Sequence, residues 1–303
     1  MKSLLSVADL SIEELRNIIH DTVRIKKNPE KFENSLKGKI LVMIFEKPST
    51  RTIVSFNAAV MQLGGHTINI NRENMQIGRG ETIADSAKVL SRYADGLVIR
   101  AEKHGTLIEF AKNSEVPVIN ALSDLEHPCQ IISDLFTVYE VKGRLDGINI
   151  VYVGDGNNVC NSLLLGCAMS GINLSVASPK GYEPSGDIVD SAIEISKRTG
   201  CEIRLTNRVE EAVQDADILY TDVWVSMGQE KEREERIKAF RNYQVNERLL
   251  NLARSDCKVM HCLPAHRGME ITDEILDSEN SIVWIQAENK LYAQKAILMK
   301  LLG

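Results

Sequence analysis

The stretch Ile40-Leu41-Val42-Met43-Ile44-Phe45-Glu46-Lys47-Pro48-Ser49-Thr50-Arg51-Thr52 begins with an apolar run and ends in four polar residues that can all donate hydrogen bonds. A short, continuous apolar run is typical of a strand buried on both faces of a parallel sheet. A helical pattern follows over about residues 52–63, and Gly64-Gly65 ends it. The stretch therefore predicts one strand-to-helix unit of an α/β fold, with the four polar residues where the strand passes into the helix.

The same alternation of strands and helices recurs along the chain. A first helix is predicted over residues 11–27, with Ser11 as its N-cap and Glu14 completing a capping box. In the first half, further strands are predicted at residues 67–70, 96–100 and 116–119, and helices near residues 82–93, 106–112 and 131–141. In the second half, strands are predicted at residues 147–153, 173–177, 202–205, 218–221, 258–261 and 282–285, with helices between them. The predicted fold class is α/β, with two doubly wound parallel-sheet domains.

Lys142-Gly143 ends the helix before the second series, so the domain boundary is expected near residues 143–147. We expect a first domain over residues 1–143 and a second over residues 147–286. A last amphipathic helix, within residues 287–303, is expected to pack back on the first domain. A chain of 303 residues is long enough for two domains of ordinary size, each with its own core.

The composition excludes several classes of protein. A net charge of −6 argues against a nucleic-acid binder. No apolar stretch approaches the roughly 18 residues of a membrane helix, and the N-terminal patch is too short for a signal peptide, so we expect a cytoplasmic protein without a membrane partner. The six cysteines are scattered without a C-x-x-C pair, which indicates reduced thiols.

Polar residues follow several predicted strands, and such sheets bind ligands outside the carboxyl ends of their strands. Free backbone N–H groups at the helix start near Ser49-Thr50-Arg51-Thr52 suit a phosphate. The simpler alternative is that Ser49 or Thr50 caps the helix and Arg51 is a solvated charge. Arg100 ends another strand, and His127 and Gln130 lie just before a helix. Together these groups predict a pocket for an anion and a carbonyl group.

These residues also carry a family resemblance. Residues 45–52 resemble the phosphate-binding signature of the aspartate and ornithine carbamoyltransferases, and His127-Pro128-Cys129-Gln130 resembles their second signature. The resemblance spans essentially the whole chain. It implies that the carbamoyl phosphate site contains Ser49, Thr50, Arg51, Thr52, Gln76, Arg100, His127, Gln130, Cys262, Leu263 and Lys290. It further implies that Gln76 reaches into the neighbouring subunit's site, and hence a homotrimer or a multiple of trimers.

Two motifs in the second half resemble the ornithine branch of this family. Asp222-Val223-Trp224-Val225-Ser226-Met227-Gly228 is similar to its D-x-W-x-S-M-G motif, and His261-Cys262-Leu263-Pro264 to its H-C-L-P motif. The resemblance implies that ornithine contacts Asn158, Asp222, Ser226 and Met227. It implies that Arg100, His127, Asp222 and Cys262 take part in catalysis. An acid after a strand is otherwise often only a cap or a turn residue.

The implied reaction joins two small-molecule substrates, carbamoyl phosphate and L-ornithine, and gives L-citrulline and phosphate. A lysine-like amine with a pKa of about 10.4 is neutral in only about one molecule in 10³ near neutral pH, so the site must favour the neutral amine. Asp222 and Cys262 would hold that amine. Thr52, Arg100 and His127 would stabilise charge on the carbonyl oxygen while Gln130 orients the carbamoyl nitrogen. Arg51 would stabilise the departing phosphate, which can itself accept the amine proton.

Other interpretations remain open at this point. The turn Gly154-Asp155-Gly156-Asn157-Asn158 could pass for a dinucleotide loop of a dehydrogenase, but it lacks the full G-x-G-x-x-G pattern. His261, Cys262 and His266 could bind zinc, but their spacing is unusual for a structural site. We expect neither a cofactor nor a metal. A carbamoyltransferase acting on putrescine or a modified ornithine, and a non-enzymatic binding protein for small anions, are further alternatives.

The sequence departs from the family pattern at two positions. Ile53 stands where the S-T-R-T-R signature has its second arginine, and this change should tune the electrostatics of the site. Lys290 stands in Ala287-Glu288-Asn289-Lys290 where the family has an arginine that binds carbamoyl phosphate. A lysine keeps the charge but loses the planar fork, so weaker binding of this substrate is expected. The sequence leaves open whether the reaction serves the synthesis or the breakdown of arginine.

Overall fold

The computed structural model describes residues 2–226 and 228–303, and it divides into two compact units. Unit 1 comprises residues 1–136 and 289–303, and unit 2 comprises residues 137–288. The division falls inside helix α5 (Pro128–Lys142), and the chain returns to unit 1 inside helix α12 (Val283–Leu302).

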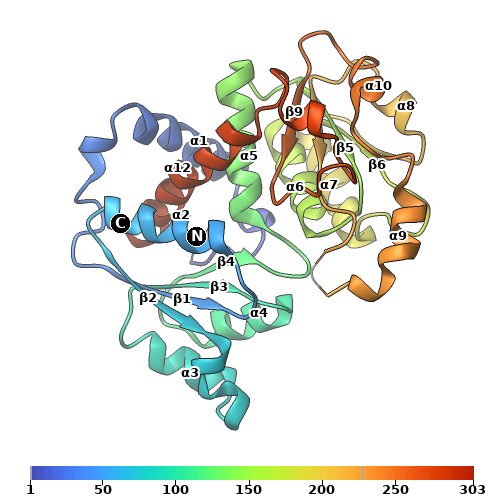
Figure 1. Ribbon diagram of the computed structural model, residues 1–303. Coiled ribbons are helices and arrows are strands. Elements are labelled where there is room, and N and C mark those ends of the chain that lie inside the picture. Colours follow the sequence, from blue (N-terminus) through green and yellow to red (C-terminus); the bar gives the residue numbers. More distant parts are fainter. Residues whose placement is uncertain (1, 227) are drawn as a thin grey trace. The chain divides into compact units, whose positions relative to one another are not determined.

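Unit 1 contains a four-stranded parallel sheet with the strand order β2-β1-β3-β4 (Figure 1). Because β1 lies between β2 and β3, the direction of winding reverses between β1 and β3. Its elements before α5 are η1 (Val7–Asp9), α1 (Ile12–Lys27), η2 (Pro29–Phe32), β1 (Ile40–Phe45), α2 (Thr50–Gln62), β2 (His66–Asn71), η3 (Arg72–Asn74), η4 (Gln76–Arg79), α3 (Ile83–Leu90), β3 (Gly96–Arg100), α4 (His104–Asn113) and β4 (Val118–Leu122).

The core of unit 1 forms where the apolar strands meet their helices. Val42 and Ile99 from the sheet cluster with Leu107 and Phe110 of α4. The C-terminal helix also belongs to this unit, since a Cβ added to Gly96 of β3 would lie 2.8 Å from the Leu302 side chain. The prediction that the C-terminal helix packs back on the first domain is therefore confirmed.

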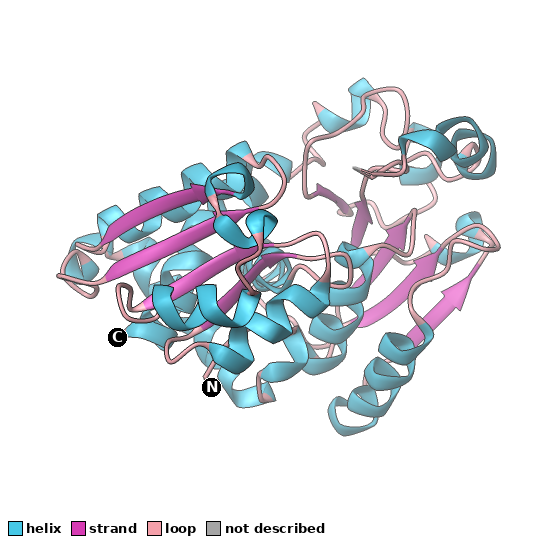
Figure 2. Ribbon diagram, turned by 90° about the horizontal axis from the view of Figure 1, so that it is seen from below, coloured by secondary structure: helices cyan, strands magenta, loops and turns pink. Residues whose placement is uncertain are grey.

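Unit 2 contains a five-stranded parallel sheet with the order β7-β6-β5-β8-β9, so its winding reverses between β5 and β8. Helices pack along the strands of each sheet (Figure 2). Its elements are β5 (Asn149–Val153), α6 (Asn158–Ser170), β6 (Asn173–Ala177), α7 (Gly186–Thr199), β7 (Ile203–Thr206), α8 (Val209–Ala212), β8 (Ile218–Thr221), η5 (Glu230–Glu232), α9 (Arg233–Phe240), α10 (Glu247–Leu250), β9 (Lys258–His261), α11 (Asp273–Leu276) and the start of α12.

The predicted α/β fold class with two doubly wound sheets is confirmed, and the capping box of Ser11 and Glu14 forms as predicted. One predicted strand is wrong. Residues 282–285 do not form a strand, because only Ser281 pairs with Val259 of β9 as an isolated bridge, and α12 begins at Val283. The last helix therefore starts four residues earlier than the predicted residue 287.

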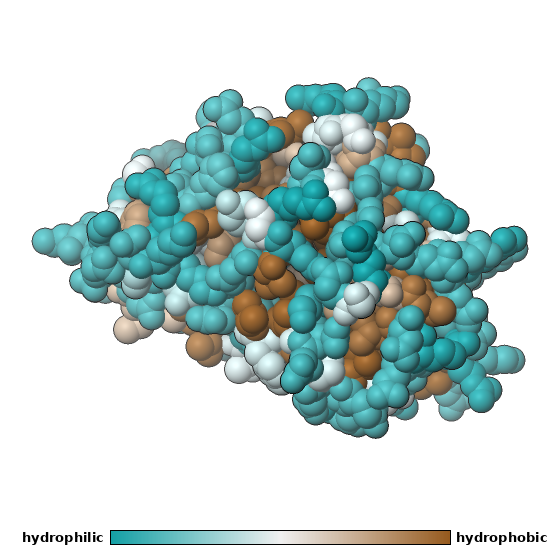
Figure 3. Space-filling view, turned by 90° about the horizontal axis from the view of Figure 1, so that it is seen from above, coloured by the Kyte–Doolittle hydropathy of each residue, from teal (hydrophilic) through white to brown (hydrophobic). Residues whose placement is uncertain are grey.

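Among residues 2–226 and 228–303, no helix is long and apolar enough to cross a membrane. The face drawn in Figure 3 is mostly hydrophilic, with apolar side chains in scattered patches.

Candidate functional site

In unit 1, polar residues gather where the sheet reverses its winding. Ser49 follows β1 and Arg100 is the last residue of β3, and these strands are neighbours with Phe45 opposite Arg100. Arg100 Nη1 donates a hydrogen bond of 3.1 Å to Ser49 Oγ. The parallel sheet thus joins two groups that lie far apart in the sequence, as ligand sites of such folds require.

The Arg100 side chain is buried without a counter-ion. It is 8% exposed, and no carboxylate partners it among the residues that the structure describes. Burial, together with the nearby Arg51 charge, lowers the pKa of Arg100 to about 10. Its Nε atom is buried and has no hydrogen-bond partner. A buried charge without a partner is costly, so this guanidinium is suited to a bound anion.

The start of α2 supports the same conclusion. Ser49 is its N-cap residue but makes no side-chain cap hydrogen bond, and the first turn carries no acidic residue. The Ser49 side chain therefore does not cap the helix, because its hydroxyl accepts from Arg100 instead. Arg51 is exposed, as the simpler alternative expected. The N-terminal N–H groups and the helix dipole remain available to an anion.

Three further groups lie in the interior of the same unit. His127, just before α5, and Gln130 within it are buried, and Gln130 Nε2 donates to Asp134 Oδ1 at 2.9 Å. Lys290 is also buried, with its Nζ atom 3.5 Å from Thr52 Oγ1. Burial, with the charges of Lys290 and Arg100, holds the pKa of His127 well below its usual range. His127 is therefore neutral near pH 7 and can donate a hydrogen bond to a carbonyl oxygen without carrying charge.

In unit 2, the corresponding reversal point carries a different set of groups. The loop at residues 154–158 follows β5, and Asp222 follows the neighbouring strand β8. A Cβ added to Gly156 would lie 2.1 Å from Pro184 N, so only glycine fits where this loop meets residues 183–184. Asn157 caps α6 by accepting from Val159 N at 3.0 Å and Cys160 N at 3.1 Å.

Asp222 lies between an amide and a thiol. Its Oδ2 atom accepts from Asn157 Nδ2 at 2.7 Å, and its Oδ1 atom lies 3.0 Å from Cys262 Sγ. The side chain of Asp222 is buried, whereas Cys262 is half-buried. The structure therefore brings together the two residues that the D-x-W-x-S-M-G and H-C-L-P motifs singled out.

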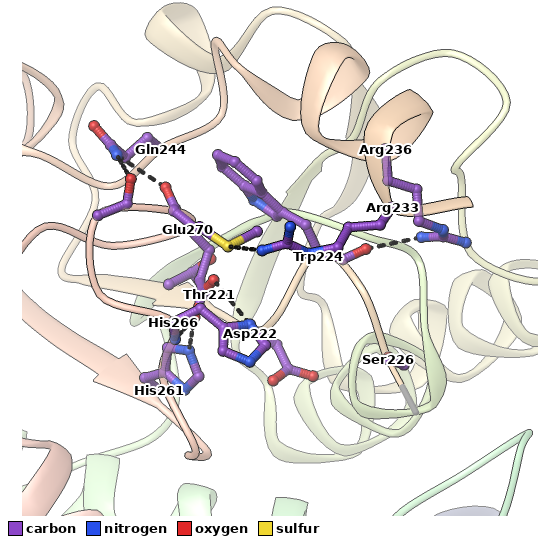
Figure 4. A network of polar contacts seen from close by, with 12 residues as sticks. Thr221, Asp222, Trp224, Ser226, Arg233, Arg236, Gln244, His261, His266 and Glu270 are labelled. Atoms are coloured by element: carbon purple, nitrogen blue, oxygen red, sulfur yellow. Dashed lines mark hydrogen bonds and ion pairs between the residues drawn. The ribbon is translucent and has the colours of Figure 1, made fainter. Parts of the chain in front are cut away.

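A buried network fixes the segment that carries Cys262 (Figure 4). His261 Nδ1 accepts from Leu263 N at 2.8 Å, and its Nε2 atom lies 3.0 Å from Glu270 Oε1. Because Nδ1 accepts, the neutral ring carries its proton on Nε2 and donates to Glu270. Glu270 also accepts from His266 N, and His261 N donates to Gln286 Oε1 at 3.0 Å.

The structure does not bring together the three residues that the sequence suggested as zinc ligands. One ligand atom each from Asp222, His261 and Cys262 lie within 4.8 Å of one another, and His266 is not part of that group. Both ring nitrogens of His261 already form hydrogen bonds. Cys262 is hydrogen-bonded to Asp222, while His261 is hydrogen-bonded to Leu263 and Glu270. The expectation of no metal stays a prediction.

The remaining predicted site residues lie in less enclosed places. Gln76 is exposed in η4, and Asn158 is half-buried at the first position of α6. Ser226 is half-buried and donates its backbone N–H to Gln229 Oε1 at 2.9 Å. Leu263 has a positive φ of 58°, which is unusual for a bulky residue. Met227 lies outside the described residues.

Sequence reasoning missed several residues that support the site: Asn157, Asp155, Arg236, Glu270 and Gln286. Asn157 had a local signal, since asparagine before a helix is a common N-cap. Asp155 had one too, since it follows the predicted strand at residues 147–153. Burial raises the pKa of Asp155 to about 6, against the opposing effect of Arg236.

Two family models match this chain, one over each half of the sequence. Residues 2–140 match the carbamoyl-P binding domain of aspartate/ornithine carbamoyltransferase, and residues 146–301 match its Asp/Orn binding domain. The chain is 51% identical to the ornithine carbamoyltransferase of Archaeoglobus fulgidus, over 100% of this chain and 98% of that protein. It is 48% identical to the catabolic ornithine carbamoyltransferase of Thermoplasma volcanium, over 100% of this chain and 99% of that protein.

Solved structures show the same likeness. The structure of the Pyrococcus furiosus ornithine carbamoyltransferase matches with a TM-score of 0.97 and 48% identity, covering 100% of this chain and 97% of that one. The family models together match most of this chain, and the relatives match over nearly their full length. The chain therefore belongs to the aspartate/ornithine carbamoyltransferase family.

Proposed function

We propose that this protein transfers the carbamoyl group of carbamoyl phosphate to the side-chain amine of L-ornithine, giving L-citrulline and phosphate. The observation that carries the choice of acceptor is the 3.0 Å contact between Cys262 Sγ and Asp222 Oδ1. A carboxylate beside a thiol suits an amine, because the carboxylate accepts its N–H groups. The relatives named for ornithine support the same acceptor over putrescine or a modified ornithine.

On the phosphate side, Arg51, the start of α2 and the Arg100 guanidinium would hold the phosphate oxygens. Arg100 is suited to this role because it has no carboxylate partner among the described residues. Ser49, Thr50 and Lys290 add donors, and Gln130 would orient the carbamoyl nitrogen. Arg100, neutral His127 and Thr52 would donate to the carbonyl oxygen as negative charge develops on it. Cys262 and Leu263 are further proposed contacts of the carbamoyl group.

On the amine side, Asp222 and Cys262 would hold the side-chain nitrogen of ornithine. Asn158, Ser226 and Met227 would bind its amino-acid end. The neutral amine attacks the carbonyl carbon, a C–N bond forms, and the bond from that carbon to the phosphate oxygen breaks. The amine proton passes to the departing phosphate, so the step balances without a covalent enzyme intermediate.

The test is formation of the carbamoylated amine from carbamoyl phosphate with a panel of acceptors: ornithine, which gives citrulline, and putrescine, N-acetylornithine and aspartate, which give their own carbamoyl products. We expect ornithine to give a kcat/KM at least about 10²-fold above the others, because a site built for polar substrate groups rejects analogues that lack them. A higher kcat/KM for another amine would replace ornithine as the acceptor. Absence of any carbamoyl product would overturn the proposal.

We also propose a cytoplasmic homotrimer, or a multiple of trimers, in which Gln76 of one subunit serves its neighbour's site. The exposed position of Gln76 in η4 supports this arrangement. Light scattering should give a mass divisible by three subunits. Mixing unfolded Gln76→Ala and Arg100→Met chains and refolding them should restore some activity, since a mixed trimer then has intact sites; no restoration would contradict a shared site.

A further inference from the structure

Asp155 and Arg236 form a buried ion pair in unit 2, and neither residue is a proposed contact of carbamoyl phosphate or ornithine. Arg236 Nη1 is 3.1 Å from Asp155 Oδ2, and both side chains are only 8% exposed. The exposed ion pairs of the same unit, such as Arg208 with Glu211, contribute little to stability. A buried pair differs, because removal of one partner leaves an uncompensated charge.

Arg236 joins segments that are distant in the sequence. Its Nη1 atom donates to Trp224 O at 3.0 Å (Figure 4). Its Nε atom donates to Glu232 Oε2 at 3.0 Å. Its guanidinium also lies over the Tyr182 ring, 5.0 Å from the ring centroid. Trp224 is two residues after Asp222, so the guanidinium ties the loop after β5 to the segment after β8.

The loop after β5 is itself firmly held. Tyr152 Oη donates to Asp155 O at 2.9 Å, and Gly156 N donates to Tyr182 O at 2.8 Å. The same loop contacts Asp222 directly through Asn157 at 2.7 Å. The segment after β8 is therefore fixed at two points, at Asp222 by Asn157 and at Trp224 by Arg236, and Asp155 fixes Arg236 in turn.

We propose that Asp155, through its ion pair with Arg236, is a positioning residue for ornithine: it holds the segment that carries Asp222 in the geometry that binds the side-chain amine. This inference rests on the proposed function. Asp155 touches no substrate in this scheme and acts only through Arg236. Its pKa of about 6 leaves it largely ionised in an assay at pH 7.5 or above, where the pair is intact.

The test compares Asp155→Asn and Arg236→Lys with the wild-type protein in citrulline assays at pH 8. The first variant removes the negative charge and keeps the shape, and the second keeps the positive charge but loses the planar fork. We expect each to raise the KM for ornithine about tenfold or more, which corresponds to roughly 1.4 kcal/mol, and to change the KM for carbamoyl phosphate by less than about twofold. The matched control is Glu211→Gln, which breaks the exposed pair with Arg208 and should leave both KM values unchanged.

A double variant separates positioning from general loss of stability. If the pair acts as a unit, Asp155→Asn combined with Arg236→Lys should raise the ornithine KM no more than the worse single variant does. A purely structural role would reduce the folded fraction measured by denaturation while the folded protein keeps its ornithine KM, and that result would overturn the proposal. If Asp155→Asn does not fold, an unchanged ornithine KM in Arg236→Lys overturns it equally. A wild-type protein that makes no citrulline would instead refute the proposed function.

Discussion

The two sheets reverse their winding in the same way but carry opposite chemistry at that point. In unit 1 the groups at the ends of the central strands are Ser49 and Arg100. The buried charge of Arg100 is positive and has no carboxylate partner in the part of the chain that the structure describes. In unit 2 the corresponding groups are Asp155 and Asp222, and both carboxylates are tied to neighbours. The fold thus creates a binding position where each sheet reverses its winding. The loop residues at that position determine whether it suits an anion or an amine.

The largest expected effect on activity comes from Arg100, the buried positive charge of unit 1. Arg100→Met removes the guanidinium and should lower kcat about 10²- to 10³-fold, as loss of one donor to a developing oxyanion does. Steady-state citrulline assays would measure it. Arg92→Met is the control, because Arg92 forms an exposed pair with Glu115 in the same unit. A kcat of Arg100→Met within about tenfold of the wild type would remove Arg100 from the proposed mechanism.

Asp222 of unit 2 predicts a different pattern of kinetic losses. Asp222→Asn should lower kcat/KM for ornithine about 10²-fold, because truncating a buried charged partner costs roughly 2–5 kcal/mol. Its KM for carbamoyl phosphate should stay close to that of the wild type. Equal losses toward both substrates would mean that Asp222 supports the whole site and has no special role toward the amine.

A third prediction concerns acid stability. His127 has a pKa held well below its usual value in the folded chain, so the unfolded chain binds a proton first as the pH falls. The contribution of His127 to the free energy of unfolding is complete above a pH of about 6.5. It is lost as the pH falls below that value, by at most about 1.4 kcal/mol per pH unit. Urea unfolding of the wild type at pH 7.5 and 5.5 should show this loss, and His127→Gln should show less of it. An identical pH dependence in both proteins would contradict a buried neutral imidazole.

The smallest effect concerns the lysine that departs from the family pattern. Lys290→Arg should lower the KM for carbamoyl phosphate about fivefold, because a planar fork can add one hydrogen bond worth roughly 1 kcal/mol. Lys300→Arg in the same helix is the control, since Lys300 lies at the surface. An unchanged KM in Lys290→Arg would show that the lysine binds this substrate as well as an arginine does.

Much of the fold followed from the sequence, because a buried parallel strand leaves a short apolar run that is easy to recognise. Strands β1 and β3 begin and end where the pattern predicts. The failure at residues 282–285 is instructive, because a short apolar run also fits the first turn of a helix. Only the single bridge at Ser281 distinguishes the two outcomes, and that contact is not encoded locally.

The site was predictable where a strand end or a motif marks it. Arg100 and Ser49 could be placed together because parallel strands end at one edge. Arg236 and Glu270 could not, since each acts through contacts with residues far along the chain, and nothing in the surrounding sequence points to them.

In the proposed mechanism, the groups of unit 1 bind the anion and the groups of unit 2 bind the amine. The most direct test is calorimetric binding of carbamoyl phosphate, without ornithine, to the wild type, Arg100→Met and Asp222→Asn. We predict that Asp222→Asn binds carbamoyl phosphate about as tightly as the wild type, while Arg100→Met binds it at least about tenfold more weakly. Undiminished binding by Arg100→Met, or an equal loss in both variants, would contradict the assignment of the anion to unit 1 and the amine to unit 2.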